Sequence, residues 1–354
     1  MKKLNIIITL AFCCIFTSCK GVVEVENVKE GDYFLLLKDE KTISINIFEE
    51  NKIKEIRSFP INENSIFATD KKRRVVVLDT AKNIILLYDI GSSMELKMSV
   101  PFEMEVISLL LNDENLFVGG KLIKRGWGNE MLIQYHLQNN EWYQLEIPEN
   151  VRLPGKAIDD LVVNDSLLIA VDNIWYPKFV LFYHLNTTGK LIFSHSKQVV
   201  SNGAYEHIHQ AKITPKYLGL KSTSWKGGGT RACFEFITIY DNLDLTSVFV
   251  VSVKRQKCLD DYEFFNDFLI IGNKLFIANK EKGLGIFEIK ESYFYKFSED
   301  DITSPNVQAT EDMVNYTQYK NEEIIHLTKI PNEEKIVLTI RNSLGEIRHE
   351  IIEA

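Results

Sequence analysis

Side chains that can exchange protons or bind metals recur at matching places in this sequence. When the chain is aligned on its repeated turns, Asp159, His209 and Asp267 fall at the same position. Asp160 and His207 lie beside them. His207 and His209 alternate along a predicted strand, so both point to one side of it. Imidazoles at this spacing, with carboxylates from neighbouring repeats, could hold a divalent ion or perform general acid–base chemistry. A hydrated polar channel would use the same residues without any chemistry.

The rest of the sequence adds no catalytic signature to these four candidates, Asp159, His207, His209 and Asp267. No further ligand is fixed by spacing, so no metal site is assigned. The motifs Gly-x-Ser-x-Gly, His-Glu-x-x-His and paired Cys-x-x-Cys are absent. We therefore expect no cofactor and name no nucleophile–base pair. An envelope hydrolase or lyase acting on a glycan or lactone stays open as the alternative to a non-enzymatic protein.

Three predicted loops each combine a tryptophan with a cation. Loops run over the surface and are normally polar, whereas Trp and Arg are the side chains that anchor interfaces, and aromatic faces also stack on sugars or cations. The loops therefore predict a binding face for a protein, peptide or glycan. The alternative is that each Trp folds back over the core of its own repeat. The residues of this face are Trp127, Trp175, Trp225, Arg125, Lys178, Lys226 and Arg231.

The elements that must position these residues come from an internal repeat. Residues 109–118 and 161–170 each read as an apolar strand, a tight Asn-Asp turn and a second apolar strand. Each then continues through a Trp-bearing loop to a third strand that ends in Tyr-His-Leu, at 135–137 and 183–185. A unit of this period cannot bury its own apolar face and must stack on its neighbours.

Recurring turn signals divide the chain into about seven such units, at 28–62, 63–103, 104–155, 156–203, 204–255, 256–300 and 301–354. Four short strands per unit of forty-odd residues predict an all-β fold, a β-propeller of seven four-stranded blades, with six or eight left open. The first and last units are shorter, as expected if the terminal strands share one blade. Residues 300–319 are the one stretch predicted to form a short helix or long loop.

A propeller would bring the candidate residues together on one face. The first strand of each blade lines the central channel, and the loop entering it opens on the same face as the loop joining strands two and three. The Trp loops and the Asp159, His209 and Asp267 positions are thus expected at the same end of the ring.

Two segments, 86–91 and 182–190, resemble the third strand and following turn of quinoprotein-like and WD40-like propeller repeats. The resemblance implies the fold and little more. The Trp-Asp ending of WD40 blades and the Ser-x-Asp-x-Gly box of sialidase-type blades are both absent.

The N-terminal residues predict where in the cell the protein is located. Lys2 and Lys3 precede an apolar run at 4–16 that is too short to span a bilayer, and small residues then lead to Cys19. This order resembles the lipobox of bacterial lipoproteins, which implies a signal peptide at 1–18, a lipidated Cys19 with a tether at 19–30, and a propeller domain at 31–354. An ordinary secretory signal is the alternative.

The resemblance also implies a place in the cell. The membrane would be contacted through the lipid anchor, and Lys20 after the cysteine favours the outer membrane by lipoprotein sorting rules, on its periplasmic or external side. Residues 79–81 and 165–167 resemble the short O-glycosylation sequon of Bacteroidetes.

Composition limits the partners. The chain has 354 residues and a net charge of -8, with no basic stripe that could follow a phosphate backbone, so nucleic acid is not an expected partner. Beyond the signal only Cys233 and Cys258 remain. In an oxidising compartment they could form a disulfide, or they could be two buried thiols.

Overall fold

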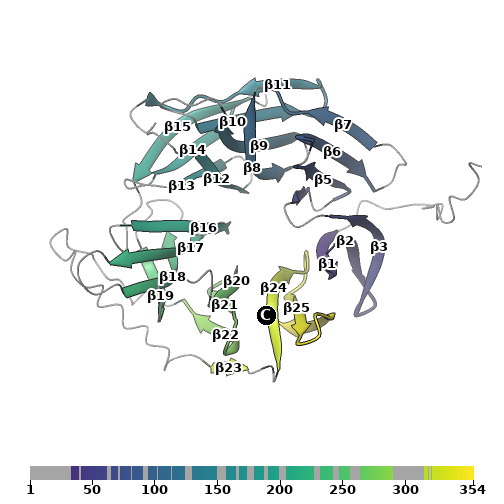
Figure 1. Ribbon diagram of the computed structural model, residues 1–354, viewed down its shortest axis with the longest axis vertical. Helices are drawn as coiled ribbons and strands as arrows, with labels where there is room; N and C mark the ends of the chain where they lie inside the picture. The colour runs from purple at the N-terminus through teal and green to yellow at the C-terminus, as the bar shows by residue number, and fades with distance from the viewer. Residues whose placement is uncertain are drawn as a thin grey trace, which may run out of the picture. The chain divides into compact units, whose positions relative to one another are not determined.

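Seven antiparallel sheets follow one another along the chain and surround a common centre, as Figure 1 shows for the computed structural model. The structure describes residues 33–354 apart from 40, 62–64, 71, 81, 91–94, 102, 113, 124–129, 150–156, 165–166, 174–178, 187–189, 199–204, 227–231, 242–246, 256–263, 290–314, 318 and 320. Each sheet is built from consecutive strands, so every blade is a local meander. The chain is an all-β, seven-bladed propeller, as predicted.

Blades 1 to 4 account for the first fifteen strands. In chain order these are β1 (Phe34–Asp39), β2 (Thr42–Glu49) and β3 (Lys52–Pro60); β4 (Ile66–Thr69), β5 (Arg74–Asp79), β6 (Ile84–Asp89) and β7 (Glu95–Ser99); β8 (Met104–Leu111), β9 (Asn115–Leu122), β10 (Glu130–His136) and β11 (Glu141–Gln144); β12 (Ala157–Asn164), β13 (Leu167–Asn173), β14 (Phe179–Leu185) and β15 (Leu191–Gln198).

Blades 5 to 7 complete the ring. They consist of β16 (Tyr205–Ile213), β17 (Tyr217–Lys226), β18 (Ala232–Asp241) and β19 (Ser247–Arg255); β20 (Phe265–Ile271), β21 (Lys274–Asn279), β22 (Gly283–Glu288) and β23 (Asn315–Thr317); β24 (Glu322–Lys329), β25 (Lys335–Asn342) and β26 (Ile347–Glu353). β23 lies inside the stretch that the sequence predicted to be a helix or loop.

The second strand of each blade explains why this sequence forms a ring. β5 and β9 are buried along most of their length, without the alternation of a half-exposed strand. A strand reads as a continuous apolar run when both faces of its sheet are covered. Here the covers are the two neighbouring blades. The outermost strand β3 has mostly exposed or partly exposed residues instead.

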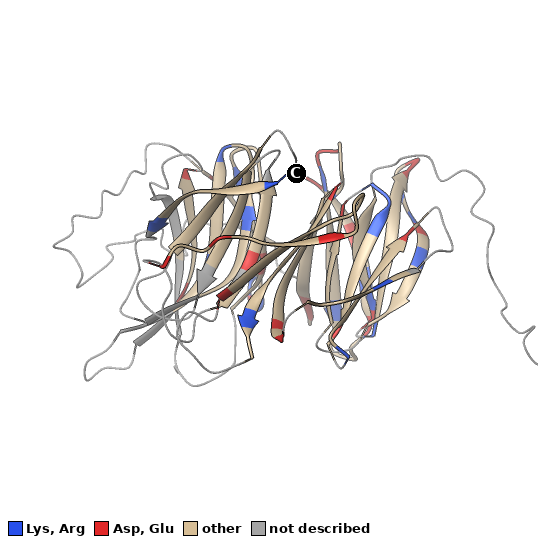
Figure 2. Ribbon diagram, turned by 90° about the horizontal axis from the view of Figure 1, so that it is seen from above, with Lys and Arg blue, Asp and Glu red and all other residues tan. Residues whose placement is uncertain are grey.

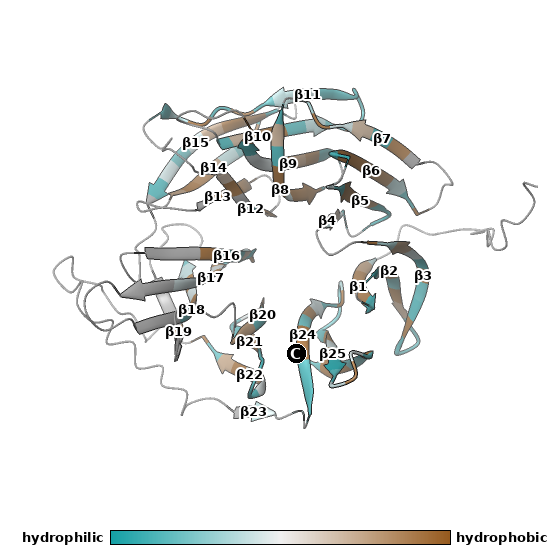
Figure 3. Cartoon of the chain, viewed as in Figure 1, coloured by the Kyte–Doolittle hydropathy of each residue, from teal (hydrophilic) through white to brown (hydrophobic). Residues whose placement is uncertain are grey.

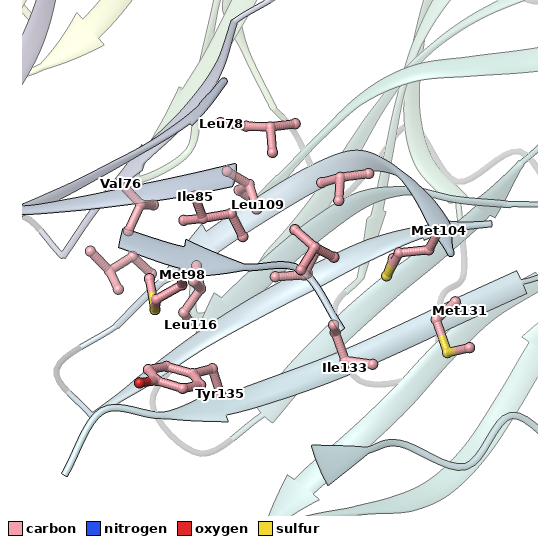
Figure 4. Close-up of a cluster of buried hydrophobic side chains, with 14 residues drawn as sticks. Val76, Leu78, Ile85, Met98, Met104, Leu109, Leu116, Met131, Ile133 and Tyr135 are labelled. Carbon is pink, nitrogen blue, oxygen red and sulfur yellow. The ribbon is translucent and has the colours of Figure 1, made fainter. Parts of the chain in front are cut away.

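The core is therefore a series of clusters between blades. In one of them Val76 and Ile85 of blade 2 pack with Leu109, Leu116 and Ile133 of blade 3 (Figure 4). The apolar segments of β5, β6 and β8 in Figure 3 belong to this cluster. Charged residues of both signs are interspersed over the ring (Figure 2).

The ring closes differently from the prediction. Among the described strands, the first and last units form separate three-stranded blades rather than one shared blade. Phe34 and Leu36 of blade 1 pack against Val337 of blade 7 and Ile330 beside it. His349 of β26 donates a hydrogen bond from Nε2 to the carbonyl of Leu37, 2.9 Å away. Side-chain packing across two short sheets thus closes the ring.

Glycine is required where blade 3 approaches blade 4. A Cβ on Gly119 would lie 2.4 Å from Oγ of Ser108 and 2.7 Å from Cγ2 of Ile158.

We expect Gly119→Ala to lower the free energy of unfolding by about 1–3 kcal/mol, because overpacking forces the neighbours apart. Urea denaturation measures this. Thr317→Ala, at an exposed position of β23, is the control and should change stability by less than about 0.5 kcal/mol. Equal stabilities of the two variants would mean that the blades are not packed this closely.

Candidate functional site

The inner strand of each of blades 3 to 7 has a β-bulge at the same place. These bulges show which residues of the repeats are equivalent, and they differ from the sequence alignment at one residue. In each of them one residue is left without a partner on the second strand of the blade. The bulged residues are Ile107, Asp159, His209, Asn266 and Ile325. The residues that follow them are Ser108, Asp160, Gln210, Asp267 and His326. Asp159 and His209 are thus equivalent, as predicted, but Asp267 lies one position later and is equivalent to Asp160.

The aspartates beside the bulges accept hydrogen bonds from backbone N–H groups that the bulges leave unpaired. An extra residue disrupts the ladder locally and leaves backbone groups to be satisfied elsewhere. Asp160 accepts hydrogen bonds from the backbone N–H of Leu161, at 2.8 Å, and from that of Ala211 in the next blade. Asp267 accepts the equivalent pair, from Phe268 and from Leu327 of the next blade, each at 2.8 Å. Each carboxylate therefore ties two blades together.

Asp267 has three further close side-chain contacts, whereas Lys212 acts on Asp160 only through its charge. Its Oδ1 accepts hydrogen bonds from Nε2 of Gln210 at 3.0 Å and from Nζ of Lys212 at 2.6 Å. Its Oδ2 lies 2.6 Å from Nδ1 of His326. The Asp267 side chain is only 1% exposed, whereas that of His326 is 40% exposed. A buried carboxylate thus supports a part-exposed imidazole.

The two equivalent aspartates differ in their electrostatics. Burial raises the pKa of Asp160 to about 6, against the lowering effects of the Ala211 and Leu161 N–H groups and of the Lys212 charge. Burial acts in the same direction on Asp267, but the charges and hydrogen bonds of Lys212 and His326 outweigh it and hold the pKa of Asp267 well below its usual range. Asp267 is therefore ionised at neutral pH.

Other buried polar groups of this region satisfy backbone groups between blades. Glu235 of β18 accepts hydrogen bonds from the N–H groups of Phe264 and Phe265, at 2.8 and 2.9 Å. Lys221 donates from Nζ to the carbonyl of Phe265 at 3.0 Å. Asn266 donates to the carbonyl of Ile324 at 2.7 Å. The junctions of blades 5, 6 and 7 are thus held by ion pairs and hydrogen bonds as well as by apolar packing.

Of the four candidates that the sequence grouped together, the structure describes the side chains of His209 and Asp267, and these two have different partners. The exposed His209 places Nε2 2.8 Å from Oγ1 of Thr223 in its own blade, while Asp267 contacts Gln210, Lys212 and His326. The side chains of Asp159 and His207 lie outside the described residues. In the part of the chain that is described, no group of three His, Cys, Asp or Glu side chains could hold a metal ion.

Sequence reasoning missed Gln210, Lys212 and His326. A signal for two of them exists: each inner strand of blades 3 to 7 reads as a bulged residue, a polar residue and an apolar residue, as in Asn266-Asp267-Phe268 and Ile325-His326-Leu327. Aligning on that triplet would have placed Gln210 and His326 beside Asp267. Nothing in the sequence singles out Lys212, which reaches Asp267 across the blade junction.

The predicted Trp face falls largely outside the description. Trp127, Trp175, Arg125, Lys178 and Arg231 lie in undescribed segments, as do Cys19 and Cys258. Of Trp225, Lys226 and Cys233 only the backbone is described: the first two belong to the end of β17 rather than to a loop, and Cys233 belongs to β18. The binding, lipidation and disulfide predictions for these residues therefore stay predictions.

The register does show at which end of the ring the second strands of blades 4 and 5 end. Trp225 at the end of β17 pairs with Tyr205 at the start of β16, and Asn173 pairs with Ala157 in the same way. The end of the second strand, the start of the inner strand and the bulge thus lie at the same end of the ring. Trp142, the remaining tryptophan, packs on Tyr135 with the ring centroids 4.7 Å apart and covers the core of its blade.

Within the described residues no helix is long and apolar enough to cross a membrane. No protein-family model matches the chain, and no curated protein matches its sequence.

Solved structures share the fold at low sequence identity. Kuenenia stuttgartiensis hydrazine synthase is similar with a TM-score of 0.58 at 12% identity, over 93% of this chain and 97% of the other. The β-propeller domain of Cps50 (Swd1) from Myceliophteria thermophila has a TM-score of 0.54 at 11% identity, over 93% and 98%. A protein of unknown function from Desulfotomaculum acetoxidans has a TM-score of 0.52 at 9% identity, over 91% and 99%. At such identities the likeness shows the propeller fold alone.

The raised pKa of Asp160 predicts a pH dependence of stability. A carboxyl whose folded pKa lies above its unfolded value contributes stability below the unfolded value, near 3.8, and loses it as pH rises through about 6. We expect the stability of the wild type relative to Asp160→Asn to fall by roughly 1–2 kcal/mol between pH 4 and pH 7. Chemical denaturation at a series of pH values measures the difference.

Asp39→Asn provides a control of opposite sign. The N–H of Lys41, followed by the hydroxyl of Thr42, lowers the pKa of Asp39 on an exposed turn. Its contribution should therefore grow as pH rises through the acidic range. A wild type and Asp160→Asn that keep a constant difference across this range would contradict the assignment for Asp160.

Proposed function

We propose that this protein is a binding module rather than an enzyme: a propeller that presents one end of its ring to a protein, peptide or glycan at the cell envelope. The observation that carries the proposal is that the second strands of three successive blades end at the same end of the ring. Residues 124–129, 174–178 and 227–231 each follow the second strand of a blade, in blades 3, 4 and 5. Sequence with a tryptophan and cations thus adjoins the end of the second strand in three neighbouring blades: Trp127 and Trp175 follow β9 and β13, and Trp225 is among the last residues of β17 itself.

The inter-blade ties support this role. Binding surfaces made of segments from several blades need those blades to hold a constant spacing, since mobility at a binding surface adds an ordering cost to association. The Asp160 and Asp267 bridges and the Glu235 contacts join consecutive blades through backbone N–H groups. The ring therefore acts as a rigid frame for the segments at its rim.

The N-terminal sequence supports the location. A lipidated Cys19 would hold the propeller at the membrane surface without any spanning segment, and the tether at 19–30 would separate the two. An outer-membrane lipoprotein with its propeller in the periplasm or outside the cell is the arrangement that we propose.

Replacing Trp127, Trp175 and Trp225 by Ala tests the binding face. We expect the triple variant to unfold at the wild-type temperature and to lose the partners that the wild type captures from envelope extract, because aromatic anchors carry most of an interface's binding energy. Thermal unfolding and affinity capture measure the two effects. Trp142→Ala is the matched control: it should lower the melting temperature, since Trp142 packs on Tyr135, and keep the partners. A triple variant that melts earlier and keeps its partners would identify the tryptophans as core caps.

Cys19→Ala tests the anchor. Without the acylated cysteine the protein should leave the membrane fraction for the soluble fraction, since no spanning segment is expected to hold it. Fractionation of cells followed by immunoblotting measures this, with Cys233→Ala as the control that should stay with the membranes. Membrane association of Cys19→Ala equal to that of the wild type would refute lipidation at this residue.

A further inference from the structure

Two large apolar side chains are exposed to water in the turns of the ring. Among the described residues the most exposed large hydrophobic side chains are those of Leu344, at 82%, and Ile123, at 64%. Leu344 lies in the turn that joins β25 to β26, and Ile123 directly follows β9. Both therefore follow the second strand of a blade, in blade 7 and in blade 3. Burial of such side chains against a partner is favourable.

The strand register places both side chains at the bulged end of the ring. Asn342 at the end of β25 pairs with Glu322 at the start of the inner strand β24, and Leu122 at the end of β9 pairs with Met104 at the start of β8. A single exposed apolar residue needs no explanation, but here the two most exposed ones share one end. The other exposed large hydrophobic residues lie within strands instead, and they are Leu96, Ile192 and Ile286.

The connections that follow the second strands at this end are mostly cationic. In blades 2 to 7 they are residues 80–83, 123–129, 174–178, 227–231, 280–282 and 343–346. Five of the six have a net positive charge, the exception being the last, although the whole chain has a net charge of -8. The connections into the inner strands at this end carry charges of both signs, and the long connection 289–314, which begins at the opposite end, is acidic. An anionic partner is therefore attracted to the connections after the second strands.

The spacing of the apolar side chains indicates a broad, flat partner. Leu344 and Ile123 belong to blades 7 and 3, with blades 4, 5 and 6 between them in the chain. A short peptide or a glycan would reach one of them, whereas a membrane surface reaches both. The sequence adds Trp127, Trp175 and Trp225 to the same connections and strand ends. Tryptophan is enriched where proteins meet lipid headgroups, and Lys and Arg are attracted to anionic lipids.

We propose that the bulged end of the propeller lies against an anionic phospholipid surface, with the side chains of Leu344 and Ile123 inserted among the lipid headgroups. A lipid anchor at Cys19 would hold the protein at the membrane without deciding which end of the ring faces the bilayer, and this contact decides it. The inference goes beyond the proposed binding function. It limits the partners of the binding face to molecules that lie at the membrane surface.

The test places a nitrobenzoxadiazole label on one introduced cysteine of the full chain, bound to vesicles of phosphatidylethanolamine and phosphatidylglycerol. We expect the label at Leu344→Cys or Ile123→Cys to brighten roughly two- to fourfold, because the label leaves water for the apolar part of the bilayer. Leu96→Cys and Ile192→Cys, which are 37% and 54% exposed within β7 and β15, are matched controls of the same residue types. Their labels should keep the fluorescence that they have in water. Labelled wild type gives the signal of the chain's own cysteines, which is subtracted.

The substitutions should leave the fold intact. Both side chains are mostly exposed, and exposed positions tolerate replacement. The backbone N–H of Leu344, which donates to Oδ1 of Asn342 at 2.9 Å, is kept with any side chain at this position.

A second measurement varies the charge of the lipid. On vesicles of phosphatidylcholine alone, or at high salt, the rise in fluorescence at Leu344→Cys and Ile123→Cys should be at least about threefold smaller, because the attraction of Lys and Arg needs anionic headgroups and is screened by salt. An equal rise on neutral vesicles would overturn the assignment of an anionic surface.

The outcomes separate the membrane contact from the proposed binding function. Unchanged fluorescence at Leu344→Cys and Ile123→Cys on vesicles, or an equal rise at all four positions, would overturn the membrane contact. A rise with lipid-free envelope extract and none with vesicles would assign these residues to a protein partner and would overturn it as well. In each of these cases, partner capture that depends on Trp127, Trp175 and Trp225 would leave the binding function intact. A rise at the two turn positions alone, with partner capture unchanged in the triple Trp variant, would support the membrane contact and refute the binding face.

Discussion

The junctions of blades 4 to 7 depend on carboxylates that accept hydrogen bonds from backbone N–H groups across blade boundaries. A bulge in the inner strand frees backbone donors, and in blades 4 and 6 the next residue is an aspartate that binds one donor of its own strand and one of the neighbouring blade. A buried donor without a partner costs about as much as a lost hydrogen bond. The bulge and the aspartate therefore belong together: the aspartate satisfies the backbone N–H groups that the bulge leaves unpaired, which apolar packing cannot do.

The two bulge aspartates have the same backbone contacts but opposite pKa shifts. Asp160 lacks a cation within hydrogen-bond distance in the described structure, and burial raises its pKa. Asp267 is surrounded by Lys212, Gln210 and His326 and is held ionised. Since the backbone contacts of the two are equivalent, the difference lies in side chains that the blade junction does not require. It marks the junction of blades 5 to 7 as the place where this ring departs from its own repeat.

Most of the strands were predictable. Units cut at recurring turns match the sheets, because apolar runs of four to eight residues between turn signals are local properties of the chain. The exception is β23, which belongs to the sheet of blade 6 but lies beyond residue 300, where the sixth unit was predicted to end. The closure of the ring was not predictable in the same way. The first and last described blades have three strands each and meet through residues such as Leu37 and His349, which are 312 positions apart.

The candidate site was likewise predictable only in part from the sequence. The sequence by itself determined that polar, titratable residues recur near the starts of the channel strands, and it identified Asp267 among them. Only the tertiary structure decided its partners, since one bulged residue shifts the register and moves Asp267 from the position of His209 to that of Gln210. The hydrogen bonds of Asp267 to Gln210 and Leu327 span 57 and 60 positions. Contacts of that range follow from the stacking of blades, a property of the closed ring that no local pattern contains.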